Sequence, residues 1–126
     1  MKEKLLLWHR FVATQDAGIL NELLDENIRF HSPFVWKPKD GRAMATRVLT
    51  TVVTVFEEFR YIREILDGPD WALEFEARIG DLTLHGVDLI KLNEAGKIID
   101  FEVMIRPANA LHALGIEMGR RLQTEE

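Results

Sequence analysis

The chain of 126 residues contains no cysteine, and this absence excludes three kinds of chemistry. Without cysteine there is no disulfide, no thiolate zinc site and no thiol nucleophile, which fits a reducing compartment. Long apolar runs are also absent, since the longest, residues 5–8, has four residues where a membrane span needs about 20. A signal peptide needs a longer apolar stretch as well. We therefore expect a cytoplasmic protein with no membrane partner.

Blocks of basic residues are absent too. Sixteen Lys and Arg residues against 21 Asp and Glu residues give a net charge of −5, and the two signs are mixed along the chain. This balance argues against a nucleic-acid partner. The four histidines show no spacing typical of metal ligands, so we expect neither a metal nor another cofactor. The length fits one domain over residues 1–126.

The first half of the chain predicts three helices and one short strand. Apolar residues at helical spacing predict a helix over residues 2–14, and Asp16 is placed to cap a second, short helix. Residues 28–32 alternate apolar and polar side chains as a strand does, and a proline follows them. Asp40 is placed to cap a third helix over residues 41–56, with an apolar stripe of Met44, Val48, Val52 and Val55.

In the second half the apolar period changes from about 3.6 to 2. Turn signals at residues 67–70, 80–81 and 93–96 separate four predicted strands of an antiparallel meander. Pro107 then starts a last helix, whose apolar stripe is Leu111, Leu114, Met118 and Leu122. This pattern predicts the α+β class.

The two tighter turns predict which residues face each other across the meander. A two-residue turn at 80–81 places Leu73 opposite Asp88, and a four-residue turn at 93–96 places Asp88 opposite Phe101. Asp88 is then the one acid on an otherwise apolar sheet face, unless a bulge shifts the register.

An isolated carboxyl group on an apolar face predicts an altered pKa. Loss of hydration disfavours the charged form, so the pKa of Asp88 should rise unless donors or a cation compensate. Perturbed carboxyl groups of this kind cluster at functional sites. The alternative is a structural role, in which Asp88 bonds a backbone amide or a buried arginine.

Glu64 is a second catalytic candidate. A four-residue turn at 67–70 places Glu64 opposite Leu73, about 10 Å from Asp88 along the sheet, where the two carboxyl groups can form a water-bridged acid/base pair. The opposite assignment turns Arg63 inward as the counter-ion of Asp88 and leaves Glu64 in solvent. Both assignments stay open.

The other face of the meander is half apolar. The same registers place His85 opposite Glu76, where an ion pair is expected, and Val87 opposite Glu102. Such a face either buries in a dimer or stays solvated.

The order of these elements, together with four motifs, resembles the NTF2-like superfamily, which includes the ketosteroid isomerases and the SnoaL-like proteins. The motifs are residues 16–18 (DAG), 31–33 (HSP), 41–42 (GR), and 86–92 (GVDLIKL) running into 94–98 (EAGKI). The resemblance implies a cone-shaped fold in which a curved antiparallel sheet wraps around N-terminal helices, with a C-terminal helix. It also implies an apolar cavity at the wide end and a homodimer formed through the outer sheet face.

The ketosteroid isomerases use a carboxylate base, a tyrosine and a protonated aspartic acid. By motif, Asp88 falls at the position of the protonated acid, whose raised pKa is a known feature of those enzymes. Ser32 falls at the base position and Phe11 at the tyrosine position. A serine cannot abstract a proton from carbon unaided, and phenylalanine donates no hydrogen bond, so ordinary ketosteroid isomerase chemistry is not expected.

The expected pocket is therefore an apolar cavity around one acid. Its ligand-binding candidates are Phe11, Ser32, Leu73 and Phe101, with Phe34 and Trp36 as an aromatic rim. The alternative for the rim residues is packing against the neighbouring helix. His31 is expected on the opposite side of its strand from Ser32.

Three functions remain open. The first is a cofactor-free isomerase, dehydratase, cyclase or hydrolase that acts on a small apolar molecule with Asp88 as acid or hydrogen-bond donor. The second is a non-catalytic pocket for a hydrophobic metabolite. The third is a dimeric protein-interaction module.

Overall fold

The computed structural model describes residues 2–124. Helices α1 (Lys2–Thr14) and α2 (Ala17–Leu23) precede strand β1 (Leu24–His31), and the short β2 (Lys39–Asp40) leads into α3 (Arg42–Val55). Then follow β3 (Glu57–Asp67), β4 (Asp70–Ile79), β5 (Leu82–Leu92), β6 (Ile98–Arg106) and α4 (Ala108–Thr124). None of the helices within 2–124 has the length and apolar character that crossing a bilayer demands.

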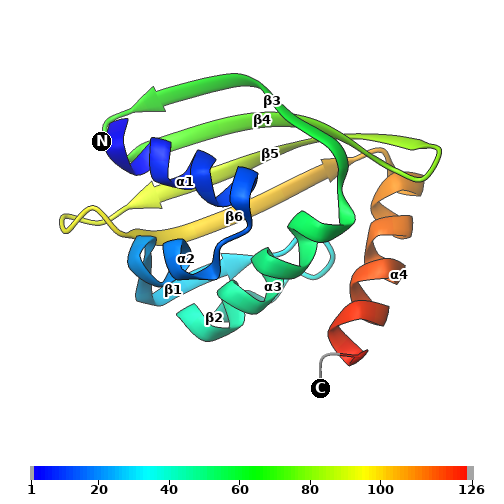
Figure 1. The fold of residues 1–126 in the computed structure, drawn as a ribbon, viewed down its shortest axis with the longest axis horizontal. Helices are drawn as coiled ribbons and strands as arrows, with labels where there is room; N and C mark the ends of the chain where they lie inside the picture. The colour runs from blue at the N-terminus through cyan, green and yellow to red at the C-terminus, as the bar shows by residue number, and fades with distance from the viewer. Residues whose placement is uncertain (1, 125–126) are drawn as a thin grey trace.

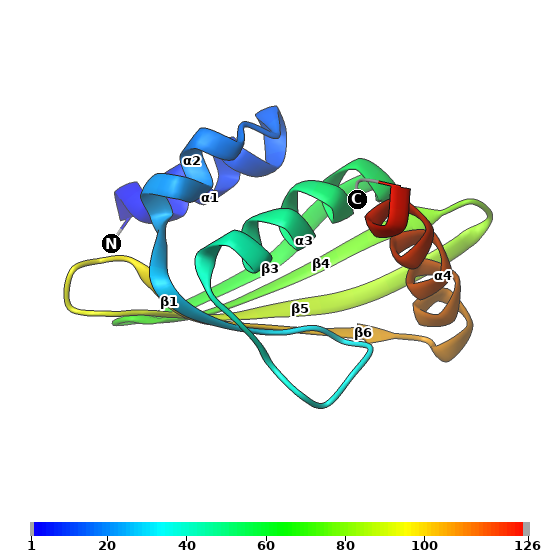
Figure 2. The same cartoon turned by 90° about the horizontal axis from the view of Figure 1, so that it is seen from below.

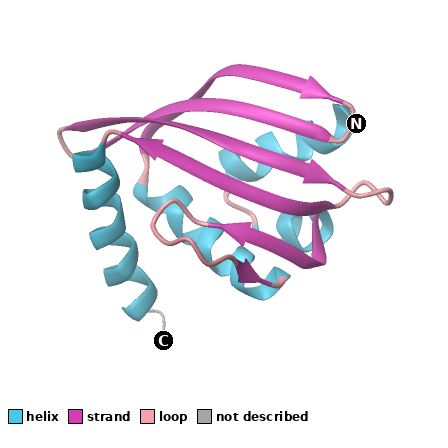
Figure 3. Cartoon of the chain, turned by 180° about the vertical axis from the view of Figure 1, so that it is seen from behind, coloured by secondary structure: helices cyan, strands magenta, loops and turns pink. Residues whose placement is uncertain are grey.

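The six strands form one curved, open sheet in the order β2-β1-β6-β5-β4-β3. All four helices lie on the same side of this sheet (Figures 1 and 2), and Figure 3 looks onto the face that they leave bare. The predicted α+β fold is confirmed. One pairing differs from the expected antiparallel sheet: β1 and β6 run parallel. The chain returns from β1 through α3 and the β3–β5 meander, and this route brings β6 beside β1 in the same direction.

The helix starts match the sequence in one case and differ in another. Asp16 caps α2 as expected, since its Oδ1 accepts a hydrogen bond from the Gly18 N–H at 2.9 Å. Asp40 does not cap α3, because it lies in β2 with its carboxylate 3.5 Å from Arg29 Nε. Gly41 takes the N-cap position with φ of 101°, in the left-handed region that favours glycine. Two residues of the predicted α3 stripe, Val48 and Val55, are buried, whereas Met44 is exposed and Val52 is partly buried. The other buried residues of α3 are Ala45, Leu49 and Thr51.

The β4–β5 register is as the two-residue turn predicts, with Leu73 opposite Asp88. The β5–β6 register is not. Asp88 lies opposite Val103, and Phe101 lies opposite Ile90. The Asn93 side chain accepts hydrogen bonds from the Ala95 and Lys97 amides, so the turn closes at Lys97 and pairing begins only at Ile98.

A bulge at the start of β6 adds the rest of the shift. From Asp100 onward the displacement from the predicted register is two residues, so these side chains of β6 keep their predicted faces. At Ile98 it is one residue, and Ile98 is buried in the core instead of lying on the bare face. The partners on the bare face move with the register, so that Val87 lies opposite Met104 instead of Glu102.

Candidate functional site

Asp88 lies on β5, on the sheet face that the helices cover, between Leu73 of β4 and Val103 of β6. It is 6% exposed, and within 2–124 no other Asp, Glu, Lys, Arg or His residue is buried. A buried carboxyl group that lacks a charged partner carries a large desolvation cost in its ionised form.

Asp88 instead has an uncharged partner. The Tyr61 hydroxyl on β3 donates a hydrogen bond to Asp88 Oδ2 at 2.6 Å. Trp8 Nε1 on α1 donates to the Tyr61 oxygen at 2.7 Å. Three elements that are distant in sequence therefore meet in one short chain of hydrogen bonds.

Burial and Tyr61 act on the pKa of Asp88 in opposite directions. Desolvation by burial is the larger influence and raises the pKa, whereas the hydrogen bond from Tyr61 stabilises the carboxylate and lowers it. The net result is a pKa raised from 3.8 to about 7. Burial also raises the pKa of Tyr61 well above its usual value, and the nearby Asp88 charge adds to this effect. At neutral pH Asp88 is thus present in both protonation states, while Tyr61 stays protonated.

A cavity of about 90 Å³ adjoins Asp88. Its polar wall residues are Trp8, Ser32, Tyr61 and Asp88. The remaining wall is aliphatic and aromatic, and six phenylalanines contribute to it: Phe30, Phe34, Phe56, Phe59, Phe75 and Phe101. The site combines one ionisable acid with an apolar enclosure, as ligand pockets for mostly apolar molecules do.

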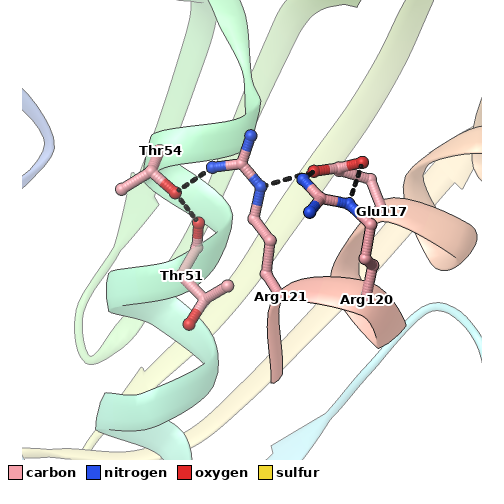
Figure 4. Close-up of polar contacts among 5 residues, drawn as sticks. All are labelled: Thr51, Thr54, Glu117, Arg120 and Arg121. Atoms are coloured by element: carbon pink, nitrogen blue, oxygen red, sulfur yellow. Dashed lines mark hydrogen bonds and ion pairs between the residues drawn. The ribbon is translucent and has the colours of Figure 1, made fainter. Parts of the chain in front are cut away.

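Helix α4 closes one side of this cavity with Leu114 and Met118. Polar contacts hold α4 against α3 (Figure 4). Arg121 donates from Nε to Glu117 Oε2 at 2.6 Å and from Nη1 to Thr54 Oγ1 at 3.0 Å. The cavity wall is therefore fixed on the helix side as well as on the sheet side.

Solved structures with this architecture include two with substantial sequence identity. A steroid delta-isomerase from Pseudomonas aeruginosa is 44% identical, with a TM-score of 0.94 and coverage of 98% of this chain and 92% of that one. A protein with a cystatin-like fold from Silicibacter pomeroyi is 43% identical, with a TM-score of 0.91 and coverage of 96% and 86%. An NTF2-like protein from Cytophaga hutchinsonii shares the fold at 18% identity, with a TM-score of 0.68 and coverage of 87% and 93%.

The chain belongs to the NTF2-like superfamily. No family model matches it, and no curated protein does.

The two predicted catalytic residues do not come together in this NTF2-like protein. Glu64 lies opposite Leu73 as predicted, but its carboxylate pairs with His9 Nε2 at 2.7 Å, and it does not line the cavity. Arg63 is not the counter-ion of Asp88 either, because it points to the bare face and pairs with Glu74 at 2.6 Å. Neither of the two assignments left open by the sequence is found, and the side chain that meets Asp88 is Tyr61.

The predicted ligand-binding residues divide into three groups. Ser32, Phe34 and Phe101 line the cavity. Phe11 and Leu73 are fully buried in the core behind the wall, and the Phe11 ring packs on Trp8 with centroids 5.4 Å apart. Trp36 forms no rim, because it is 97% exposed in the loop after β1.

The sequence reasoning missed Tyr61 and Trp8. Continued from the turn at 67–70, strict alternation sends Tyr61 to the bare face, opposite Glu76. A register shift between Tyr61 and Arg63 places Tyr61 opposite Phe75 instead. Only the residue types could have identified these two residues from the sequence, since a phenol and an indole each carry a polar group that needs a hydrogen-bond partner when buried.

Replacing Tyr61 with Phe is expected to raise the pKa of Asp88 further above its value of about 7. The change removes the hydrogen bond that stabilises the carboxylate and leaves the desolvation in place. Carboxyl ¹³C NMR of labelled aspartate measures this pKa directly. An unchanged or lower pKa in Tyr61→Phe would show that the hydroxyl does not act on the charged form.

Two histidines lie on the bare face and pair with acids there. His31 contacts Asp100 at 3.4 Å, on the expected side of β1. His85 pairs with Glu74 at 2.6 Å and not with the predicted Glu76, because Glu76 is engaged by Arg60 at 2.7 Å. Residues 2–124 hold no group of three acids or histidines that could bind a metal ion. Pairing of two copies through the bare face stays a prediction.

Proposed function

We propose that this NTF2-like protein is an enzyme that moves a proton within a small, mostly apolar molecule, with Asp88 as its acid–base group. One observation carries the proposal: Asp88 is the only carboxyl group of residues 2–124 on the wall of an apolar cavity, and its pKa is about 7. A group with a pKa near neutral can both give and take a proton. The likeness to a structure described as a steroid delta-isomerase supports this class of reaction.

One carboxyl group suffices for two such reactions. In an isomerisation next to a carbonyl group, the Asp88 carboxylate takes a proton from one carbon, and the neutral acid returns it to another carbon. In a dehydration, neutral Asp88 protonates a hydroxyl group that leaves as water, and the carboxylate then takes a proton from the neighbouring carbon. Each reaction returns Asp88 to its starting state, so neither needs a base at Ser32.

The cavity limits the size of the molecule. About 90 Å³ is less than the roughly 150 Å³ of a cavity known to hold benzene, and well below the roughly 300 Å³ at which typical ligand pockets begin. A ligand of benzene size or larger therefore requires movement of the wall. Phe34, which is 39% exposed, is the wall residue best placed to move.

A thermal-shift screen followed by turnover assays tests the proposal. Small cyclic enones and tertiary alcohols should raise the Tm of the wild type by mass action. Asp88→Asn should retain binding but lose turnover by about 10²–10⁴-fold, the range that general acid–base catalysis contributes. Asp40→Asn is the matched control, because Asp40 lies in β2, away from the cavity, with its side chain 72% exposed, and it should keep full turnover.

A non-catalytic binding protein is the second candidate, and the small, enclosed apolar cavity favours it. In that case Asp88 fixes the polar end of the ligand by one hydrogen bond. Bound compounds that show no turnover in the wild type would support this candidate and contradict the enzyme. Turnover that survives in Asp88→Asn would remove Asp88 from the reaction.

A further inference from the structure

The hydrogen bonds of Trp8, Tyr61 and Asp88 can be assigned a direction from their chemistry. An indole nitrogen carries a hydrogen and no accessible lone pair, so Trp8 can only donate. The Tyr61 oxygen must therefore accept at the 2.7 Å contact with Trp8. Within 2–124 the only other hydrogen-bond partner of this hydroxyl is Asp88 Oδ2, at 2.6 Å.

The Tyr61 hydroxyl has one hydrogen, and within residues 2–124 Asp88 is the only acceptor that it contacts. If neutral Asp88 donated to Tyr61, the phenol hydrogen would have to turn away from Asp88, where the Trp8 N–H already points at the oxygen and no acceptor is present, at a cost of about 1–3 kcal/mol. The arrangement in which Tyr61 donates to Oδ2 leaves no donor unpaired. In the neutral acid the proton then resides on the other oxygen, Oδ1.

Oδ1 is the oxygen that is free for a ligand. It has no hydrogen-bond partner in the described residues. It is nevertheless not a fully buried unpaired atom, so it has some accessible surface, and Asp88 lines the cavity. The acid proton is thereby directed into the cavity.

Trp8 is itself held rigidly. Its indole packs between Phe11 and Phe101, with ring centroids 5.4 and 5.2 Å away, and it is buried. The Tyr61 ring meets Phe59 edge to face at 5.0 Å. Neither ring can turn to another partner without disturbing several aromatic neighbours.

We propose that Trp8 is a positioning residue, which fixes the direction of the Tyr61 hydroxyl and so keeps the acid proton of Asp88 on the oxygen that faces the cavity. For catalysis this inference rests on the proposed function. It also names the ligand class: when Asp88 is neutral, the group next to Oδ1 is a hydrogen-bond acceptor such as a carbonyl, ether or hydroxyl oxygen. The Ser32 hydroxyl, just after β1, accepts a hydrogen bond from the Phe34 amide at 3.4 Å.

Few polar or charged groups surround the hydrogen bonds of Trp8, Tyr61 and Asp88. Tyr61 approaches Asp88 from β3, and the His9–Glu64 pair lies beyond Tyr61, with the His9 ring 5.4 Å from the Tyr61 ring. The flanking residues of β4 and β6, Leu73 and Val103, are apolar. Apart from the His9–Glu64 pair, these neighbours do not titrate, so a change in the direction of the Tyr61 hydroxyl can be attributed to Trp8 or Asp88.

Tyr61 is the only tyrosine of the protein, so Raman spectroscopy reads its hydroxyl without labels. The intensity ratio of the two bands of the tyrosine Raman doublet is lower for a donating hydroxyl and higher for a purely accepting one. In the wild type without ligand, we expect a donor-type ratio at about pH 5 and at about pH 9, on both sides of the Asp88 titration. A change to the acceptor type at pH 5 would overturn the assignment, whatever the protein binds.

Trp8→Phe tests the role of Trp8, because phenylalanine keeps an aromatic ring in the core and removes the N–H together with part of the indole. We expect the Tyr61 doublet at pH 5 to move toward the acceptor type and the Asp88 pKa to rise. Without the indole donor the phenol hydrogen can turn into the space that the N–H occupied, and neutral Asp88 can then donate to the Tyr61 oxygen. Trp36→Phe is the matched control at an exposed indole and should change neither. A donor-type doublet in folded Trp8→Phe at pH 5 would show that Trp8 does not set the direction. Should Trp8→Phe fail to fold, the wild-type spectra at the two pH values still decide the assignment.

Discussion

Replacing Asp88 with Asn is expected to stabilise the protein relative to wild type by an amount that grows with pH, up to roughly 4 kcal/mol. The native pKa of Asp88 is about 7, against 3.8 for an unperturbed aspartic acid. Between these values the native wild type holds a proton that the unfolded chain has released, so its stability falls as pH rises. About 1.4 kcal/mol for each unit of pKa gives the magnitude. The Asp88→Asn variant has no proton to lose at this position and shows no such fall.

Urea unfolding of both proteins at several values from pH 4 to pH 8 measures this difference. The two free energies of unfolding should diverge between about pH 4 and pH 7 and run parallel above that. Asp40→Asn, on the exposed edge strand, serves as the surface control. Parallel curves for Asp88→Asn and wild type throughout the range would mean that Asp88 is not desolvated in solution.

Replacing Gly86 with Ala is expected to destabilise the protein by about 3 kcal/mol, at the upper end of the usual cost of overpacking. A Cβ atom at this position would lie 2.4 Å from Phe75 Cζ and 2.7 Å from the Met104 carbonyl oxygen. The phenylalanine ring packs against Phe59 and Phe56 and has little room to move. The carbonyl oxygen belongs to β6, so moving it disturbs the strand pairing beside Asp88.

Gly119→Ala provides the matched control. Gly119 lies in α4 with no atom within 4 Å of an added Cβ, and alanine in a helix is favoured over glycine by up to about 1 kcal/mol. Chemical denaturation should therefore show Gly119→Ala at or above wild-type stability and Gly86→Ala far below it. Equal stabilities for the two variants would contradict the packing of Phe75 over Gly86.

Local turn chemistry explains why so much of the β4–β5 region could be predicted from sequence. A two-residue turn leaves only one register, and that register alone placed Asp88 on the apolar face beside Leu73. The second hairpin was predicted two residues out of register, because the Asn93 side chain and the adjacent bulge altered the closure. A register shift of two residues leaves the side chains on the same sheet face. Asp88 is therefore on the predicted face, although its partner on β6 is Val103 and not Phe101.

The partners of Asp88 could not be predicted in the same way. The bulge in β3 turns both Glu64 and Tyr61 to the covered face of the sheet, which strict alternation does not allow. Period-2 reasoning cannot locate a bulge that has no glycine or turn signal. Trp8 contacts Tyr61 across 53 positions of sequence, through the packing of α1 on the sheet. Such a contact depends on the tertiary arrangement and has no local pattern. The register of Glu64 was predicted correctly, but its carboxylate pairs with His9 and does not face the cavity.

The most direct test of the account is the pKa of Asp88 in the wild-type protein without ligand. Carboxyl ¹³C NMR of aspartate-labelled protein, with the resonance assigned by its loss in Asp88→Asn, follows the titration from about pH 3 to pH 9. The account predicts a midpoint near 7, the value expected for an acid buried against an apolar cavity with one phenol as partner. A midpoint near 4 would contradict it, because Asp88 would then be an ordinary carboxylate at neutral pH.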